Sequence, residues 1–177
     1  MRIEFCATPY TFVDVPGFTT VWNAPQCRER GVYLWCLEQQ GAYLINYVGM
    51  TAGRDGFTGR LWTELRDWRA GWYAAGVDLE RFTAGQRVVL PDCSPDVINA
   101  QRIALEPLYR IFLSSIPDPT TTRQVESFIV YSLMQHPYTA QYLGNKKPER
   151  YKRPPIEFEI ASAAPLIGLT AAIPVVT

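Results

Sequence analysis

The stretch GVYLWCLEQQGAYLINYVG, residues 31–49, decides the fold of this chain. Residues 32–37 and 42–48 are rich in branched and aromatic side chains, which favour strands, and residues 38–41 between them have turn character. The stretch therefore predicts a β-hairpin. Its first strand begins on the motif Gly31-Val32-Tyr33 and its second ends on the motif Tyr47-Val48-Gly49.

A helix is predicted directly after the hairpin, over residues 58–75. A loop containing Gly53, Asp55 and Gly56 precedes it, and its apolar residues recur at the spacing of one helical face. These residues are Leu61, Leu65, Trp68 and Trp72.

The second half of the chain predicts one more strand and two more helices. Residues 86–90 are a candidate third strand, and Ser94-Pro95-Asp96 is typical of a helix start. That helix is predicted to run to about residue 114, bent or broken before Pro107. A further helix is predicted over residues 124–135, and His136 before Pro137 is interpreted as its C-terminal cap.

These elements predict an α+β fold, a small antiparallel three-stranded sheet flanked by helices. We divide the chain into an irregular N-terminal extension over residues 1–29, a central domain over 30–150 and a C-terminal extension over 151–177. The alternation of residues 156–160 predicts a strand in that last segment, which we expect to pack on the domain as strand and loop.

Composition excludes several classes of protein. Seventeen Lys and Arg residues against seventeen Asp and Glu residues leave no global basic field, so any contact with phosphate must come from local clusters. Four cysteines without a C-x-x-C pair and a single histidine argue against a Cys/His zinc site. Residues 160–176 are uncharged but contain proline and glycine and are too few to span a bilayer. No signal-like apolar segment begins the chain, so we expect a cytoplasmic protein without a membrane partner.

The two tripeptides of the hairpin resemble the signature of the GIY-YIG nuclease family. In that family the two tyrosines lie on adjacent strands, an arginine sits on the next helix, a glutamate on a later helix holds a divalent metal, and an asparagine follows. The resemblance implies that this site is formed here by Tyr33, Tyr47, Arg60, Glu126 and Asn145.

Each implied residue suits hydrolysis of a phosphodiester. Arg60 offers a planar fork of donors that matches a phosphate. Glu126 provides the hard oxygen ligand that Mg²⁺, or Mn²⁺ in its place, prefers, and a single carboxylate leaves the metal open to water and substrate. The resemblance implies that Tyr33 takes or orders the proton of the attacking water, its pKa lowered by metal and arginine, while Tyr47 orients water or phosphate.

Other roles remain open for several of these residues. Arg60 could simply pair with Glu64 one turn later, Glu126 could be a first-turn glutamate favoured by the helix dipole, and Glu106 is a rival metal ligand. The interval from Tyr47 to Arg60 is longer than the family usually shows, so Arg54 is a possible substitute for Arg60. Glu64 stands where many members carry a histidine or tyrosine, and could act as a base, ligate metal or pair with Arg60.

A basic run beside Asn145 could follow a phosphate backbone, although a solvated segment would have the same composition. It consists of Lys146, Lys147, Arg150, Lys152 and Arg153. Arg54, Arg66 and Arg69 could extend the positive surface around the first helix.

The sequence thus predicts a metal-dependent endonuclease that hydrolyses DNA by a GIY-YIG-like single-metal mechanism. The alternative is a catalytically silent module of the same fold that binds nucleic acid or protein. The chain contains no recognisable reader of base sequence such as a helix-turn-helix or zinc finger.

Overall fold

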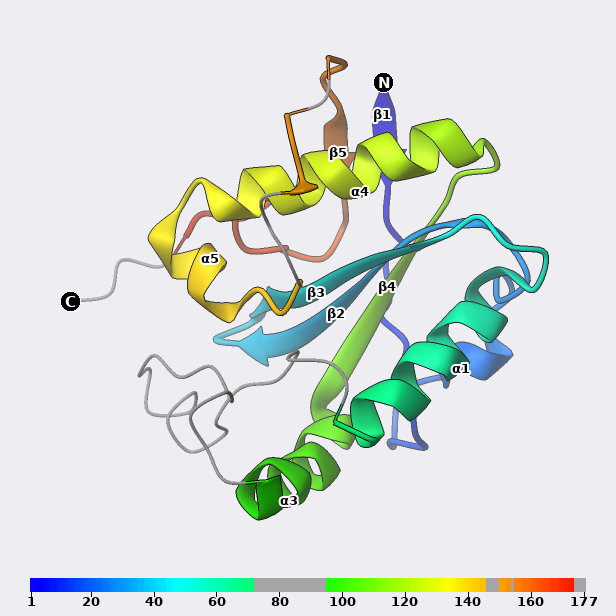
Figure 1. Cartoon of the computed structure of the whole chain (residues 1–177), viewed down its shortest axis with the longest axis vertical. Coiled ribbons are helices and arrows are strands. Elements are labelled where there is room, and N and C mark those ends of the chain that lie inside the picture. Colours follow the sequence, from blue (N-terminus) through cyan, green and yellow to red (C-terminus); the bar gives the residue numbers. More distant parts are fainter. Residues whose placement is uncertain (72–94, 146–149, 154, 174–177) are drawn as a thin grey trace.

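The computed structural model describes residues 1–71, 95–145, 150–153 and 155–173, and these form an α+β structure (Figure 1). Three antiparallel strands make the main sheet, in the order β3-β2-β4. A separate parallel pair joins β1 (Arg2–Glu4) to β5 (Glu159–Ala161), so the two extensions of the chain meet. The described residues include the helices α1, α3, α4 and α5. The predicted fold class is confirmed.

The predicted hairpin is also confirmed. Strand β2 (Gly31–Gln39) pairs with β3 (Ala42–Thr51). The turn between them consists of Gln40 and Gly41, whose φ angles of 52° and 79° are both positive. Positive φ at both central residues is what a type I′ turn requires, and this turn type matches the right-handed twist of the strands.

A β-bulge at Asn46 interrupts the regular pairing of the hairpin. Trp35 lies opposite Tyr47, but the next residue of β2, Cys36, lies opposite Ile45, so Asn46 has no partner across the ladder. Side chains alternate between the faces of a strand, and an extra residue reverses that alternation. The bulge therefore turns Tyr47 to the same face as Tyr33, where both belong to one core cluster.

Helix α1 (Gly56–Arg69) covers that face of the sheet, and α4 (Pro119–Met134) covers the opposite face (Figure 1). The predicted helix after the hairpin begins two residues earlier than expected and ends at Arg69, while Trp72 lies outside the described residues. Under α1 the core is rich in aromatic side chains, among them buried Tyr33, Trp35, Phe57, Trp68 and Tyr109. Under α4 it is mainly aliphatic, with buried Val32, Leu34, Val125, Ile129 and Val130.

The third strand of the sheet lies where the sequence predicted a helix. Helix α3 (Pro95–Leu105) ends in a short 3₁₀ turn, η3 (Glu106–Leu108), and the chain then becomes β4 (Tyr109–Ser115). The prediction of a helix to residue 114 is wrong beyond Leu108. A strand buried on both faces reads as a continuous apolar run that periodicity cannot distinguish from a buried helix, and here β2 supplies the pairing. The candidate strand over residues 86–90 lies outside the described residues.

Two further predictions are corrected near α4. The helix begins at Pro119, capped by the Asp118 carboxylate, which accepts the Thr121 N–H at 2.7 Å, so Glu126 lies in mid-helix rather than in the first turn. His136 is the N-cap of α5 (Pro137–Tyr142), not a C-terminal cap. Its Nδ1 accepts the Tyr138 N–H at 3.1 Å, because Pro137 begins a new helix at once. No helix among the described residues combines the length and apolar character needed to cross a membrane.

Candidate active site

A buried carboxylate, that of Glu64 on α1, is the centre of the candidate site. Only 1% of its side chain is exposed. It accepts hydrogen bonds from the hydroxyls of both motif tyrosines, from Tyr33 at Oε2 and from Tyr47 at Oε1 over 3.1 Å. Arg60, one turn earlier on the helix, places its Nη2 2.8 Å from Oε1. The structure thus brings together Tyr33, Tyr47, Arg60 and Glu64, and it contains the predicted Arg60–Glu64 pair.

The local backbone explains why these side chains meet. The bulge turns Tyr47 toward α1, and Gly49, opposite Tyr33 in the ladder, leaves room for the end of the Tyr33 ring, which a Cβ at that position would overlap. Gly56 begins α1 with a φ of 59° against the Arg28 backbone, where a side chain would collide. The helix therefore starts against the segment that precedes β2, and it carries Glu64 to the hydroxyls of the two tyrosines.

Burial and neighbouring charges set the electrostatics of this cluster. Burial, followed by the charge of Glu64, raises the pKa of the Tyr33 hydroxyl well above its ordinary value, while Arg60 acts to lower it. The lowering that the resemblance implies includes the effect of a bound metal and stays a prediction. Burial also raises the pKa of Glu64, although Arg60 and the two tyrosine hydroxyls oppose that shift. In this arrangement Tyr33 is a neutral hydrogen-bond donor, and Glu64 is the group suited to accept a proton.

Arg60 connects the buried cluster to solvent. Its side chain is 44% exposed. Partial burial lowers the pKa of its guanidinium, but Glu64 and the tyrosines raise it by more, so the charge is retained. Arg60 lines a hollow of about 330 Å³ formed by the β3–α1 loop and the first turns of α1, together with Asp55 and Gly59. An anion entering this hollow would meet a guanidinium held in place by Glu64.

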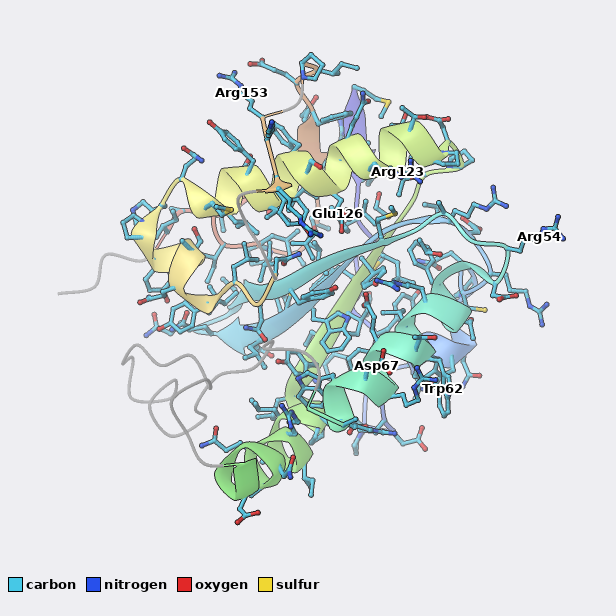
Figure 2. The ribbon with its side chains drawn as sticks, in the orientation of Figure 1. Arg54, Trp62, Asp67, Arg123, Glu126 and Arg153 are labelled. Atoms are coloured by element: carbon cyan, nitrogen blue, oxygen red, sulfur yellow. The ribbon has the colours of Figure 1, made fainter. Side chains whose placement is uncertain are left out.

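Glu126 is the second carboxylate of the site and lies on the side of α4 that faces β3 (Figure 2). Burial, and then the negative charge of Glu64, raise its pKa to about 7, while Arg60 lowers it. The Glu126 carboxylate accepts no hydrogen bond and forms no ion pair within the described part of the chain.

The rival ligand Glu106 is engaged elsewhere. It lies in η3 and accepts two hydrogen bonds from the Arg69 guanidinium at the end of α1, one of them from Nε at 3.0 Å. This geometry gives no support to Glu106 as the metal ligand in place of Glu126. Among the described residues, no group of three or more His, Cys, Asp or Glu side chains could hold a metal ion.

Asn145 braces the edge strand of the sheet. Its Oδ1 accepts the Val48 N–H at 3.0 Å and its Nδ2 donates to the Val48 carbonyl at 2.7 Å, so the amide completes the hydrogen bonding of β3 beside the motif. Its Nδ2 also lies 3.3 Å from the hydroxyl of Tyr151. Asn145 is buried, and its position supports a role in holding Val48 and Gly49 in place.

Tyr151 is a site residue that the sequence did not indicate. Burial raises the pKa of its hydroxyl, the hydrogen bond from Asn145 lowers it, and the charges of Glu126 and Glu64 raise it again. Tyr151 therefore lies next to Asn145 and within the electrostatic influence of both carboxylates. In the sequence, Tyr151 stands out only as an aromatic residue within the basic run. That feature alone does not predict a place in the candidate site.

The candidate nucleic-acid contacts are dispersed. Arg54 projects from the β3–α1 loop away from the molecule, as Figure 2 shows, and does not take the place of Arg60. Arg66 is paired with Asp67 at 2.7 Å, and Arg150 is exposed. Lys146 and Lys147 lie outside the described residues.

Comparison of the chain with protein-family models, curated proteins and solved structures finds no match. The chemistry of the site is therefore argued from its own residues.

Proposed function

We propose that this chain is a metal-dependent endonuclease that hydrolyses phosphodiester bonds in DNA, with a site of the GIY-YIG kind. The observation that carries the proposal is the buried Glu64 carboxylate, which accepts hydrogen bonds from both motif tyrosines and pairs with Arg60. The charge of Glu64 also helps to raise the pKa of the unpartnered Glu126 carboxylate. Surface ion pairs do not need such a set of donors, whereas proton transfer beside a bound phosphate does.

Arg60 is assigned to the phosphate. The hollow that it lines is open to solvent at the β3–α1 loop, and its guanidinium retains its charge. Two parallel N–H donors of one guanidinium can bind two phosphate oxygens and stabilise the charge that develops on them during attack. The contact to Glu64 keeps the fork oriented before substrate arrives.

Glu64 is assigned as the final proton acceptor. Because its side chain is almost fully enclosed, an attacking water would first meet a tyrosine hydroxyl. As the water oxygen bonds to phosphorus and the bond to the leaving oxygen breaks, a water proton passes to the tyrosine oxygen and the tyrosine proton passes to Glu64. The leaving oxygen is protonated from solvent. Neither tyrosine has to ionise, which agrees with the raised pKa of Tyr33.

Glu126 is the residue that would hold a divalent cation. Its carboxylate is half-buried, lacks a cationic partner among the described residues and is repelled by Glu64. Bound Mg²⁺ or Mn²⁺ would supply charge stabilisation at the phosphoryl and leaving oxygens. The chain itself contributes the oxygen ligand, the enclosed setting and the neighbouring carboxylate, which together favour a doubly charged ion.

This activity is proposed to operate in the cytoplasm. The three cysteines that the structure describes, Cys6, Cys27 and Cys36, are all free thiols, which agrees with a reducing compartment.

A cleavage assay on supercoiled and branched DNA with Mg²⁺ or Mn²⁺ tests the proposal. We expect Arg60→Ala and Glu126→Ala each to slow cleavage by about a hundredfold or more. The matched control is Glu157→Ala, which removes an exposed carboxylate from an ion pair remote in sequence. Unchanged cleavage in both variants, in protein whose circular dichroism shows it to be folded, would remove the assigned roles.

A silent binding module is the second candidate, and one observation favours it. Both carboxylate oxygens of Glu64 accept hydrogen bonds from within the protein, as they would in a structural network. This candidate predicts DNA binding without cleavage under any divalent metal. The same assay separates the two, provided that binding is measured in parallel.

A further inference from the structure

A pair of tryptophans outside the candidate active site forms a surface of its own. Trp62 on α1 is 57% exposed, and its ring meets that of Trp22 edge to face, with centroids 5.7 Å apart and planes inclined at 73°. Trp22 belongs to the 3₁₀ turn η1 (Val21–Asn23) of the N-terminal segment. Figure 2 shows Trp62 on the outer side of α1, away from the sheet.

The Trp22 side chain is held in place by the core, so Trp62 packs against a ring whose position is fixed. The indole Nε1 of Trp22 donates to the Phe12 carbonyl at 2.8 Å, and its ring lies 6.2 Å from that of Phe12, a buried core residue. An exposed aromatic ring whose position is set in advance loses little conformational entropy when another ring stacks on it. The pair therefore has the form of a stacking platform.

Cations accompany the platform. Trp22 lines a hollow of about 360 Å³ together with Arg28, Arg54, Asp55 and Gly59. Arg28 and Arg54 are exposed and have no ion-pair partner among the residues that the structure describes. The first N–H groups of α1 are already used, since those of Phe57 and Thr58 donate to the Glu29 and Cys27 carbonyls. An anion in this hollow would consequently be bound by the arginine side chains.

This hollow meets the one that contains Arg60. Asp55 and Gly59 line both, so the two depressions adjoin at the first turn of α1. Gly59 has no side chain to separate them, although glycine inside a helix costs about 1 kcal/mol relative to alanine. A chain of phosphates could continue from Arg60 past Asp55 to Arg28 and Arg54, with its bases near Trp22 and Trp62.

We propose that the Trp22–Trp62 surface binds unpaired nucleotides of a single DNA strand. This inference rests on the proposed nuclease function for its direction, because it places the unpaired segment beside the phosphate bound by Arg60. Flat aromatic faces beside arginines suit single strands, whose bases are free to stack, and not a duplex, whose bases are already stacked. The proposed ligand is therefore a strand that offers both exposed base faces and a phosphate backbone.

Fluorescence anisotropy with a labelled oligothymidylate, in the absence of divalent metal, tests the proposal. We expect Trp62→Ala to weaken binding of the single strand by about tenfold or more, and Trp62→Phe to retain most of it. A duplex of the same length should be affected much less. The matched control is Ile103→Ala on α3, which removes another exposed apolar side chain and should leave binding unchanged.

The arginines are tested by the dependence of binding on salt. Arg28→Ala and Arg54→Ala should each flatten the plot of log affinity against log salt by about 0.7 if each contacts one phosphate of a single strand. Equal affinity of Trp62→Ala and Ile103→Ala for the single strand would overturn the proposal. Neither measurement depends on cleavage. If the wild-type protein fails to cleave DNA but Trp62→Ala still weakens binding of the single strand, the proposed nuclease function is refuted and the proposed binding surface is not.

Discussion

Two Arg–Glu pairs of this chain share their spacing and their length but differ in surroundings. Arg60–Glu64 and Arg153–Glu157 both join residues i and i+4, and both have an N–O distance of 2.8 Å. The Glu64 side chain is 1% exposed and that of Glu157 is 81% exposed. Only Glu64 also receives two tyrosine hydroxyls. The ion pair itself is therefore not what distinguishes the candidate site.

The difference in burial between the two pairs indicates which of them is the better candidate for a functional role. An exposed pair contributes about 0–1 kcal/mol and can be lost or gained with little effect. A buried carboxylate must recover a desolvation cost of several kcal/mol from its hydrogen bonds, and an apolar replacement is often as stable. The burial of Glu64 is therefore no evidence of added stability, and proton transfer is the role that we propose for it.

The sharpest way to break the comparison is to neutralise each carboxylate. Glu64→Gln keeps the shape of the side chain but removes the proton acceptor, so cleavage should fall by about a hundredfold to ten-thousandfold. Glu157→Gln should leave the rate unchanged. Single-turnover cleavage of supercoiled DNA measures both. Equal rates for the two variants would show that Glu64 takes no part in proton transfer.

Removing the cation from each pair tests the energetic side of the contrast. Arg60→Ala leaves a buried charge with only tyrosine donors, which should cost about 3 kcal/mol of the free energy of unfolding. Arg153→Ala should cost about 0–1 kcal/mol. Urea unfolding followed by tryptophan fluorescence gives both values. A cost for Arg60→Ala as small as that for Arg153→Ala would mean that water reaches Glu64 freely.

The contrast between a buried and an exposed polar side chain can also be tested with two asparagines. Asn145→Ala leaves the N–H and carbonyl of Val48 without their buried partner, so stability should fall by about 1–3 kcal/mol. Asn23→Ala removes a more exposed amide that donates to Thr20, and should cost less than about 1 kcal/mol. If Asn145 braces the edge strand, cleavage by the folded fraction of Asn145→Ala should decline less than in Glu64→Gln.

The smallest expected effect is a dependence of stability on pH. The pKa of Glu126 is about 7 in the folded protein, above the value of about 4.3 for an unperturbed glutamate. A raised folded pKa gives stability that is fully present below about pH 4 and is lost as the pH rises through about 7. Wild type should therefore lose roughly 1–2 kcal/mol more than Glu126→Gln between pH 5 and pH 8, once solvent screening is allowed for.

Thermal unfolding across this pH range measures the difference. Glu157→Gln serves as the exposed control and should follow the wild type. Divalent metal added at pH 8 should restore stability to the wild type and not to Glu126→Gln, because a bound cation adds its binding free energy to that of folding. A wild-type curve parallel to that of Glu126→Gln at every pH would contradict the raised pKa.

Local patterns predicted those parts of the fold and site that depend on neighbours in sequence. The hairpin follows from two strand-forming runs around a turn, and the pairing of Arg60 with Glu64 follows from helical spacing. Strand β4 could not be predicted in this way, because Tyr109–Ser115 is a strand only through its pairing with β2. The run of residues after Pro107 is equally compatible with a buried helix.

The remaining features depend on contacts between distant segments. Tyr151 joins the site through Asn145, and Asn145 through Val48, a chain of contacts that no spacing rule describes. The raised pKa of Tyr33 arises from burial beneath α1 and from the charge of Glu64, and neither can be read from the residue type. Trp62 carries no motif, and its interest comes only from its exposure and its contact with Trp22.

The bulge at Asn46 lets the hairpin hold one extra residue without losing the site. If β3 paired regularly outward from the turn at its present length, Tyr47 would lie opposite Leu34 and face α4, while Tyr33 would stay where it is. The two hydroxyls would then stand on opposite sides of the sheet. Deleting Asn46 would instead leave a regular ladder with Tyr47 still opposite Trp35. The arrangement should therefore tolerate loss of the bulged residue, but not loss of the bulge at unchanged length, and selection on this stretch would act on where the extra residue is placed as well as on its residue types.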